Sequence, residues 1–226
     1  MIPPGLLLVG FICFLTILTP SITAVESSPT NSVSNKGIYI SATNPINAYY
    51  SINSTTNKEL LSLKGKRALG TDFYLPFPNT YSSATSFTDA GVGFDIVATS
   101  ASLTTVLITP RAACVGRAKN VTFAITLNQG ETFSMKDNGV VNPSELAGSI
   151  VSADRNIAIT INGAVKTNTS CNSYFADQIT NSSEIGKDYV IVKGNALNEV
   201  AYILAPENGT SLSITTPTGT ISWLIN

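Results

Sequence analysis

Short runs of β-branched and aromatic residues recur along most of this chain, and they constrain its fold more than any other feature. Gly, Pro, Asn and Ser separate these runs, and several alternate apolar and polar residues, as Val121, Phe123 and Ile125 do. This period of two is typical of strands that bury one face. We expect strands at residues 38–41, 46–52, 72–77, 94–98, 104–109, 121–127, 149–152, 157–161, 189–193, 200–205, 211–215 and 221–225. The pattern predicts an all-β, antiparallel fold, in which only residues 57–68 could form a helical turn.

An internal repeat indicates how these strands are organised. Three phrases recur in the same order: residues 37–46 match 148–157, residues 69–74 match 185–190, and residues 96–110 match 203–217. Recurrence in order predicts a duplicated β unit. We expect one β domain at 37–226 with β-sandwich-like units at about 37–147 and 148–226. A single larger β architecture, such as a barrel or a propeller-like fold, is the alternative.

The N-terminus sets the expected compartment. Residues 5–18 form a nearly continuous apolar run, followed by Pro20 and the small residue Ala24. This arrangement predicts a signal peptide at 1–24, a flexible polar lead-in at 25–36 and a secreted, extracellular protein. No Lys or Arg precedes the run, so an uncleaved membrane anchor is the alternative. A spanning helix needs about 20 apolar residues, and the run is shorter, which favours the signal peptide.

Cysteines and glycosylation motifs agree with an extracellular chain. Cys13 lies within the predicted signal, which leaves Cys114 and Cys171 to form one disulfide, unless one thiol bonds to another chain. The five Asn-x-Ser/Thr motifs are candidate N-glycosylation sites. They begin at Asn53, Asn120, Asn168, Asn181 and Asn208, and turn-like sequence favours the last two.

Composition excludes several classes of function. The chain has no histidine, which rules out an imidazole base, a Ser-His-Asp triad and a His-ligated metal. Thirteen Lys and Arg residues against fourteen Asp and Glu residues leave a net charge of −1, which argues against nucleic acid as a partner. We expect no cofactor, no metal, and membrane association only if the N-terminal segment stays uncleaved.

The repeated phrases also carry a family resemblance. Gly148–Asp154 with Ile157–Ile159, then Cys171, Asp177–Ile179 and Ile185–Val192, resemble the IgGFc-binding protein N-terminal domain family. Residues 68–76, 94–99, 104–110 and 127–133 are similar to its other recurring segments. The resemblance spans about residues 37–217. It implies a secreted or surface module that is found beside mucus-associated and adhesive architectures, without known catalysis. The stretch before Cys171 lacks a cysteine that the family often places there.

Two pairs of carboxylates could in principle serve a glycan hydrolase. Asp72 and Asp188 occupy the same position of the repeat, and Glu131 with Asp154 is the other pair worth testing. A turn Asp that bonds its own backbone explains the repeated Asp equally well, and we prefer this interpretation.

Basic and aromatic residues suggest binding surfaces. Lys64, Lys66 and Arg67 could contact an anionic glycan, although a solvated loop is the simpler interpretation. Aromatic platforms could come from Tyr49, Tyr50, Tyr74 and Tyr81, whereas we expect Trp223 to pack in a sheet or the core.

The sequence therefore predicts a secreted, non-enzymatic binding or adhesion module, associated with mucus or matrix, that recognises an extracellular protein or glycan through surface loops. An extracellular carboxylate-dependent glycan hydrolase and a structural subunit of an extracellular matrix are the alternatives.

Overall fold

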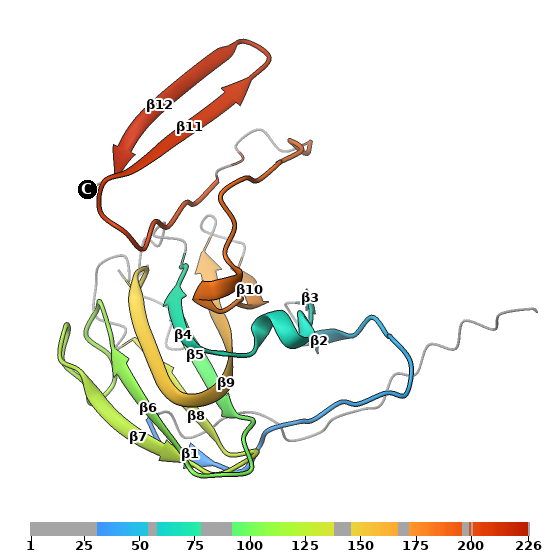
Figure 1. The fold of residues 1–226 in the computed structure, drawn as a ribbon, viewed down its shortest axis with the longest axis vertical. Helices are drawn as coiled ribbons and strands as arrows, with labels where there is room; N and C mark the ends of the chain where they lie inside the picture. The colour runs from blue at the N-terminus through green and yellow to red at the C-terminus, as the bar shows by residue number, and fades with distance from the viewer. Residues whose placement is uncertain are drawn as a thin grey trace, which may run out of the picture.

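The computed structural model describes residues 31–53, 58–77, 92–137, 146–166, 172–195, 199 and 201–225 (Figure 1). The predicted signal peptide at 1–24 lies outside these residues. Among the residues that are described, no helix is both long and apolar enough to cross a membrane.

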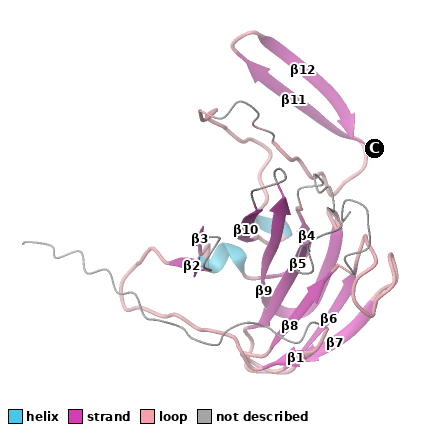
Figure 2. Ribbon diagram, turned by 180° about the vertical axis from the view of Figure 1, so that it is seen from behind, coloured by secondary structure: helices cyan, strands magenta, loops and turns pink. Residues whose placement is uncertain are grey.

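One eight-stranded sheet dominates the fold, and all its pairings are antiparallel. Its main path runs β1 (Val33–Ser34), β8 (Thr132–Lys136), β5 (Val92–Ala98), β9 (Ser149–Lys166), β6 (Thr104–Thr109) and β7 (Phe123–Leu127). Two further strands, β4 (Gly70–Leu75) and β10 (Asn172–Gln178), also pair with β9. The remaining elements are the hairpin of β2 (Tyr49–Asn53) and β3 (Lys58–Ser62), the hairpin of β11 (Thr210–Thr216) and β12 (Gly219–Ile225), and the 3-10 turns η1 (Gly65–Ala68) and η2 (Ser182–Glu184). The predicted all-β, antiparallel fold class is confirmed (Figure 2).

Strand β9 organises the sheet because it pairs with four other strands. It is 18 residues long, and its first part pairs with β4 on one edge and β6 on the other. Its second part pairs with β5 and β10. The sheet curves around this strand, as Figure 1 shows, so its two halves can face each other across an apolar core.

The core takes its side chains from alternate positions of the strands. Phe73 of β4, Phe94 of β5 and Ile108 of β6 are fully buried, as are Val151 and Ile159 of β9. Because successive strand residues point to opposite faces, their neighbours in sequence face outward. Burial of this apolar set is the main driving force for the fold.

The expected boundary between repeat units at 147 and 148 falls between β8 and β9. Since β9 pairs with β4, β5 and β6, the main sheet runs across this boundary. The two strands expected at 149–152 and 157–161 are joined in β9. The continuity of the sheet across residues 147 and 148 and the length of β9 both depend on pairing between strands that are distant in sequence. Local sequence patterns do not reveal such pairing.

Some of the expected strands were wrong. Residues 38–41, residues 189–193 and the described part of 200–205 lie outside strands, although their composition suits β structure. Strands β3 and β10 were missed, whereas η1 is the helical turn that residues 57–68 could form. Trp223 lies in the β11–β12 sheet, one of the two expected settings, and is 48% exposed because this hairpin lies apart from the core (Figure 1).

The burial of Ile159 gives a direct test of the core. We expect Ile159→Asp to abolish soluble, folded protein, because burying an unpaired charge costs several kcal/mol. Ile150→Asp is the matched control in the same strand, since Ile150 is 43% exposed. Soluble yield and thermal unfolding are the measurements, and normal folding of Ile159→Asp would contradict the assigned core.

Candidate binding surface

Strands β7, β6, β9 and β4 lie side by side and present one continuous outer face, which we call the outer face. Its centre is apolar: Leu107 of β6 is 45% exposed, and Ile150 of β9 is 43% exposed. Ile150 lies opposite Tyr74 of β4 on one edge and opposite Thr109 of β6 on the other. Leu107 lies opposite Ala124 of β7. These side chains share one face because directly paired residues point the same way.

Hydroxyl groups surround this apolar centre. The Thr109 and Thr122 side-chain oxygens lie 2.7 Å apart in a hydrogen bond, and Thr105 is paired with Thr126. The face is therefore an apolar strip bordered by threonine hydroxyls on the β6–β7 side and by the Asp72 carboxylate on the β4 side, where Asp72 lies opposite Ser152. The sequence contained a signal for this apolar centre: in the alternating run of β6, Leu107 is apolar at a position that faces outward.

Three of the four candidate catalytic carboxylates accept hydrogen bonds that stabilise turns or strands. The Thr71 hydroxyl donates to Asp72 at 2.7 Å, the Thr105 amide donates to Asp154 at 2.8 Å, and the Asn128 amide donates to Glu131 at 2.7 Å. Asp188 is exposed. Among the described residues, no group of three or more His, Cys, Asp or Glu residues could hold a metal ion. These contacts favour turn and strand stabilisation over paired acid-base catalysis.

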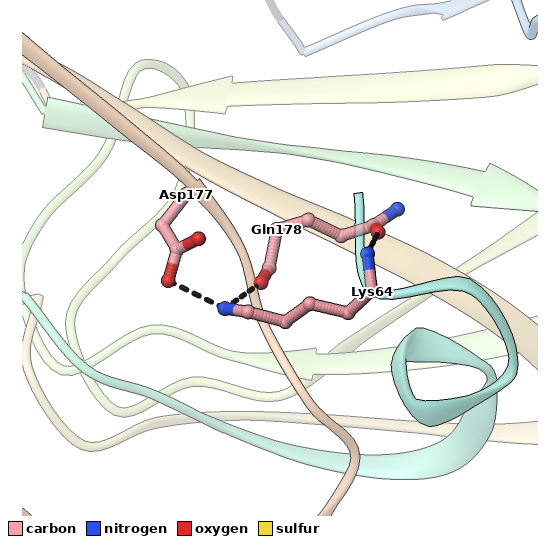
Figure 3. A network of polar contacts seen from close by, with 3 residues as sticks. All are labelled: Lys64, Asp177 and Gln178. Carbon is pink, nitrogen blue, oxygen red and sulfur yellow. Dashed lines mark hydrogen bonds and ion pairs between the residues drawn. The ribbon is translucent and has the colours of Figure 1, made fainter. Parts of the chain in front are cut away.

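Lys64 of the predicted basic cluster is part of a polar network with β10 (Figure 3). Its Nζ lies 2.6 Å from Asp177 Oδ2 and also donates to the Gln178 carbonyl. Its backbone amide donates to Gln178 Oε1 at 2.6 Å. The network connects the segment before η1 to β10, whereas Lys66 and Arg67 remain exposed.

Asn181 supports the same junction from the η2 side. Its side chain is buried, and its Nδ2 donates to the Leu69 carbonyl at 2.7 Å and to the Arg67 carbonyl at 3.3 Å. Its Oδ1 accepts a hydrogen bond from the Ser183 amide at 2.9 Å. A Cβ on Gly70 would lie 2.4 Å from the Cβ of Asn181, so only glycine fits there.

This packing argues against a glycan on Asn181, which the sequence had favoured. A glycan would replace one of the two amide hydrogens that Asn181 donates. Asn120 and Asn208 are exposed and have room for a glycan. Asn53 lies in β2, and Asn168 lies outside the described residues.

Glycopeptide mass spectrometry can separate these sites. We expect glycans on Asn120 and Asn208 and none on Asn181. Asn181→Ala should lower the free energy of unfolding by about 2 kcal/mol, because the Leu69 carbonyl and the Ser183 amide lose the side-chain partners that Asn181 gives them. Asn208→Ala is the matched control and should leave stability unchanged. Full glycan occupancy of Asn181 in folded protein would contradict its structural role.

Asp95 is a half-buried carboxylate that the sequence analysis missed. It lies on β5, where Asn162 Nδ2 donates to its Oδ2 at 2.6 Å. Burial raises the pKa of Asp95, while hydrogen bonds from Ser134 and Asn162 and the positive charge of Lys136 oppose this rise. The available signal was one acidic residue inside the apolar run 92–98.

The raised pKa of Asp95 predicts the sign of its pH dependence. The folded state binds more protons at this site than the unfolded state, so its contribution to stability declines as pH rises through the folded pKa. Asp95→Asn removes this dependence. As pH rises from 4 toward 7, the free energy of unfolding of Asp95→Asn should therefore increase relative to that of the native protein. Asp72→Asn is the control at an exposed carboxylate. A constant difference across this range would contradict the burial effect.

Cys114 carries a free, buried thiol near the Ala112 carbonyl. Burial, and secondarily the negative charge of Asp137, raises the pKa of Cys114 to about 12. A thiol with such a pKa is a poor nucleophile at neutral pH. Cys171 lies outside the described residues, so the Cys114–Cys171 disulfide stays a prediction.

The predicted aromatic platform does not gather on the outer face. Tyr74 lies there, half-buried, whereas Tyr49 and Tyr50 are exposed on β2. Tyr81 lies outside the described residues.

Comparison with known proteins decides the family. The family model described as IgGFc binding protein matches residues 59–224. This chain belongs to the IgGFc binding protein family. No curated protein and no solved structure matches the chain significantly. Family membership indicates an extracellular binding module with a protein partner, and the family is not known for enzymatic activity.

Proposed function

We propose that this chain is a secreted, non-enzymatic binding module of mucus or matrix that recognises a protein through its outer face. The observation that carries the proposal is the exposed apolar strip of Leu107 and Ile150 on a rigid sheet in a chain of this family. The N-terminal signal and the glycans on Asn120 and Asn208 belong to the same proposal. Intact mass of the secreted protein, before and after glycan removal, tests both.

The chemistry of the outer face suits a protein partner. Specific protein interfaces combine a well-packed apolar centre with a polar rim, and charged residues are depleted at their centre. Leu107 and Ile150 supply the centre, and the threonines of β6 and β7 supply the rim. Among the described strands, β7 pairs only with β6, so its other edge is open to a partner strand.

Binding to the Fc fragment of immunoglobulin G is the first test, because the family description names this partner. We expect the purified protein to bind immobilised Fc. Leu107→Asp and Ile150→Asp should each weaken binding at least about tenfold, since a charge at the centre of an interface is poorly solvated. Both variants should keep the native melting temperature.

Leu103→Asp is the matched control, because Leu103 is 53% exposed but precedes β6 at the end of the sheet. It should bind as the native protein does. Unchanged binding of both outer-face variants would contradict the assigned surface. Binding to an array of free glycans without any binding to Fc would contradict a protein partner of this kind.

A further inference from the structure

Two hairpins of the chain are built on the same register. Tyr49 pairs with Ser62 in the β2–β3 hairpin. Thr160 and Gln178, which lie 111 and 116 residues further along, pair in the β9–β10 hairpin. These are the offsets at which residues 37–46 match 148–157 and residues 69–74 match 185–190. The first hairpin therefore has the backbone pairing of the second.

The segments that follow the two hairpins also have matching hydrogen bonds and matching 3-10 turns. The Leu63 amide donates to the Ala48 carbonyl at 2.9 Å, and the Ile179 amide donates to the Ile159 carbonyl at 3.0 Å. These partners are again 116 and 111 residues apart in sequence. Each segment continues into a 3-10 turn, η1 or η2. Residues 37–53, which we call the N-terminal arm, thus correspond to β9.

The segment after η2 corresponds to the strands that follow η1. Residues 185–225, which we call the C-terminal block, begin with the counterpart of β4 and end with the hairpin of β11 and β12. In the main sheet, β4, β5 and β6 all pair with β9. Within the described part of the C-terminal block, β11 and β12 pair only with each other, and residues 186–195 form no ladder. The block has sequence counterparts of β4, β5 and β6, but within its described residues no counterpart of the long central strand.

Side chains that the main sheet buries are exposed in both segments. Phe73 and Leu75 of β4 are fully buried, whereas their counterparts Tyr189 and Ile191 are 73% and 72% exposed.

The N-terminal arm shows the same contrast with β9. Val151 and Ile157 are fully buried, whereas their counterparts Ile40 and Ile46 are 52% and 58% exposed. Residues 37–53 also contain no charged residue, as expected of a strand buried on its edges and one face. Pro45 corresponds to Asn156, in the part of β9 where the register with β4 shifts, so proline is tolerated there.

We propose that the N-terminal arm of one copy supplies the missing central strand to the C-terminal block of a second copy. The arm would pair through its open edges with residues 186–191 and 201–205, as β9 pairs with β4 and β5. The β2–β3 hairpin would be kept, as the β9–β10 hairpin is.

Contacts within the chain favour pairing of the N-terminal arm with the C-terminal block of a second copy over pairing with the block of its own chain. The Gly37 amide donates to the Gly130 carbonyl at 3.0 Å, and Lys64 is bonded to Gln178. Both ends of the arm region are thus held on the main sheet, and Figures 1 and 2 show the arm and the C-terminal hairpin projecting from different sides. Such a contact is head-to-tail, so it builds rings or open chains rather than only symmetric dimers.

Light scattering of size-separated, deglycosylated protein tests this assembly. We expect the native protein to show at least twice the monomer mass at high concentration. The donor variant Ile40→Lys/Ile46→Lys and the acceptor variant Ile191→Lys should each be monomeric. Tyr39→Lys is the matched control, because Tyr39 corresponds to Ile150 on the outward side of β9, and it should still associate.

Mixing the two variants distinguishes head-to-tail assembly from other modes. The acceptor variant keeps an intact arm and the donor variant keeps an intact block, so the mixture should form a one-to-one complex of twice the monomer mass. Monomeric native protein at all concentrations, or a mixture that stays monomeric, would overturn the proposal. Monomeric native protein with a lowered melting temperature in both variants would show closure within one chain and would also overturn it.

A synthetic peptide of residues 37–53 gives an independent readout. In excess it should dissociate the native assembly to monomer, whereas a peptide carrying Ile40→Lys and Ile46→Lys should not. Equal effects of the two peptides would contradict strand exchange. Binding to Fc through the outer face does not depend on this assembly, so monomeric variants that still bind Fc separate the two proposals.

Discussion

The pairing of β9 with four other strands is the constraint on which the rest of this structure depends. Partners on both edges at residues 150–152 and 160–163 satisfy the backbone groups of β9 within the sheet, and its inward side chains fill the core between both halves. The outer face exists because the same strand turns Ile150 outward between β6 and β4. The core and the candidate binding surface are therefore two faces of one element.

Polar contacts then fix what lies beside β9. Lys64 joins the segment before η1 to β10, and buried Asn181 joins η2 to the carbonyls of residues 67 and 69. The isolated ion pair of Lys64 with Asp177 is partly exposed and contributes little stability. The Asn181 side chain is buried and makes several hydrogen bonds, so it holds this junction more firmly.

Much of this could be read from the sequence, because β-branched alternation is a local signal. It located β4, β5, β6 and β7 within a few residues and set the all-β class. The repeat coincides with matching registers in two hairpins, and the main sheet contains strands from both sides of the expected boundary between units. The partners of β9 come from distant parts of the chain, and local patterns do not encode them. For the same reason, residues 189–193 have strand composition without a strand in the structure.

The functional residues were harder to predict than the strands. Burial of Asn181 follows from its contacts with residues 67–70, and its sequence alone marked it as a glycosylation site. Leu107 and Ile150 become a surface only when β6 and β9 lie side by side. Asp95 was missed, although it is the one charge in the apolar run 92–98, because the groups around it come from β8 and β9.

Native-state hydrogen exchange of the monomeric protein tests the central role of β9 most directly. The account predicts that amides of β9 and β5 exchange most slowly, through global unfolding, while those of residues 186–195 exchange rapidly. Equal protection of residues 186–195 and of β9 in the monomer would contradict it, because the C-terminal block would then already have a central strand of its own.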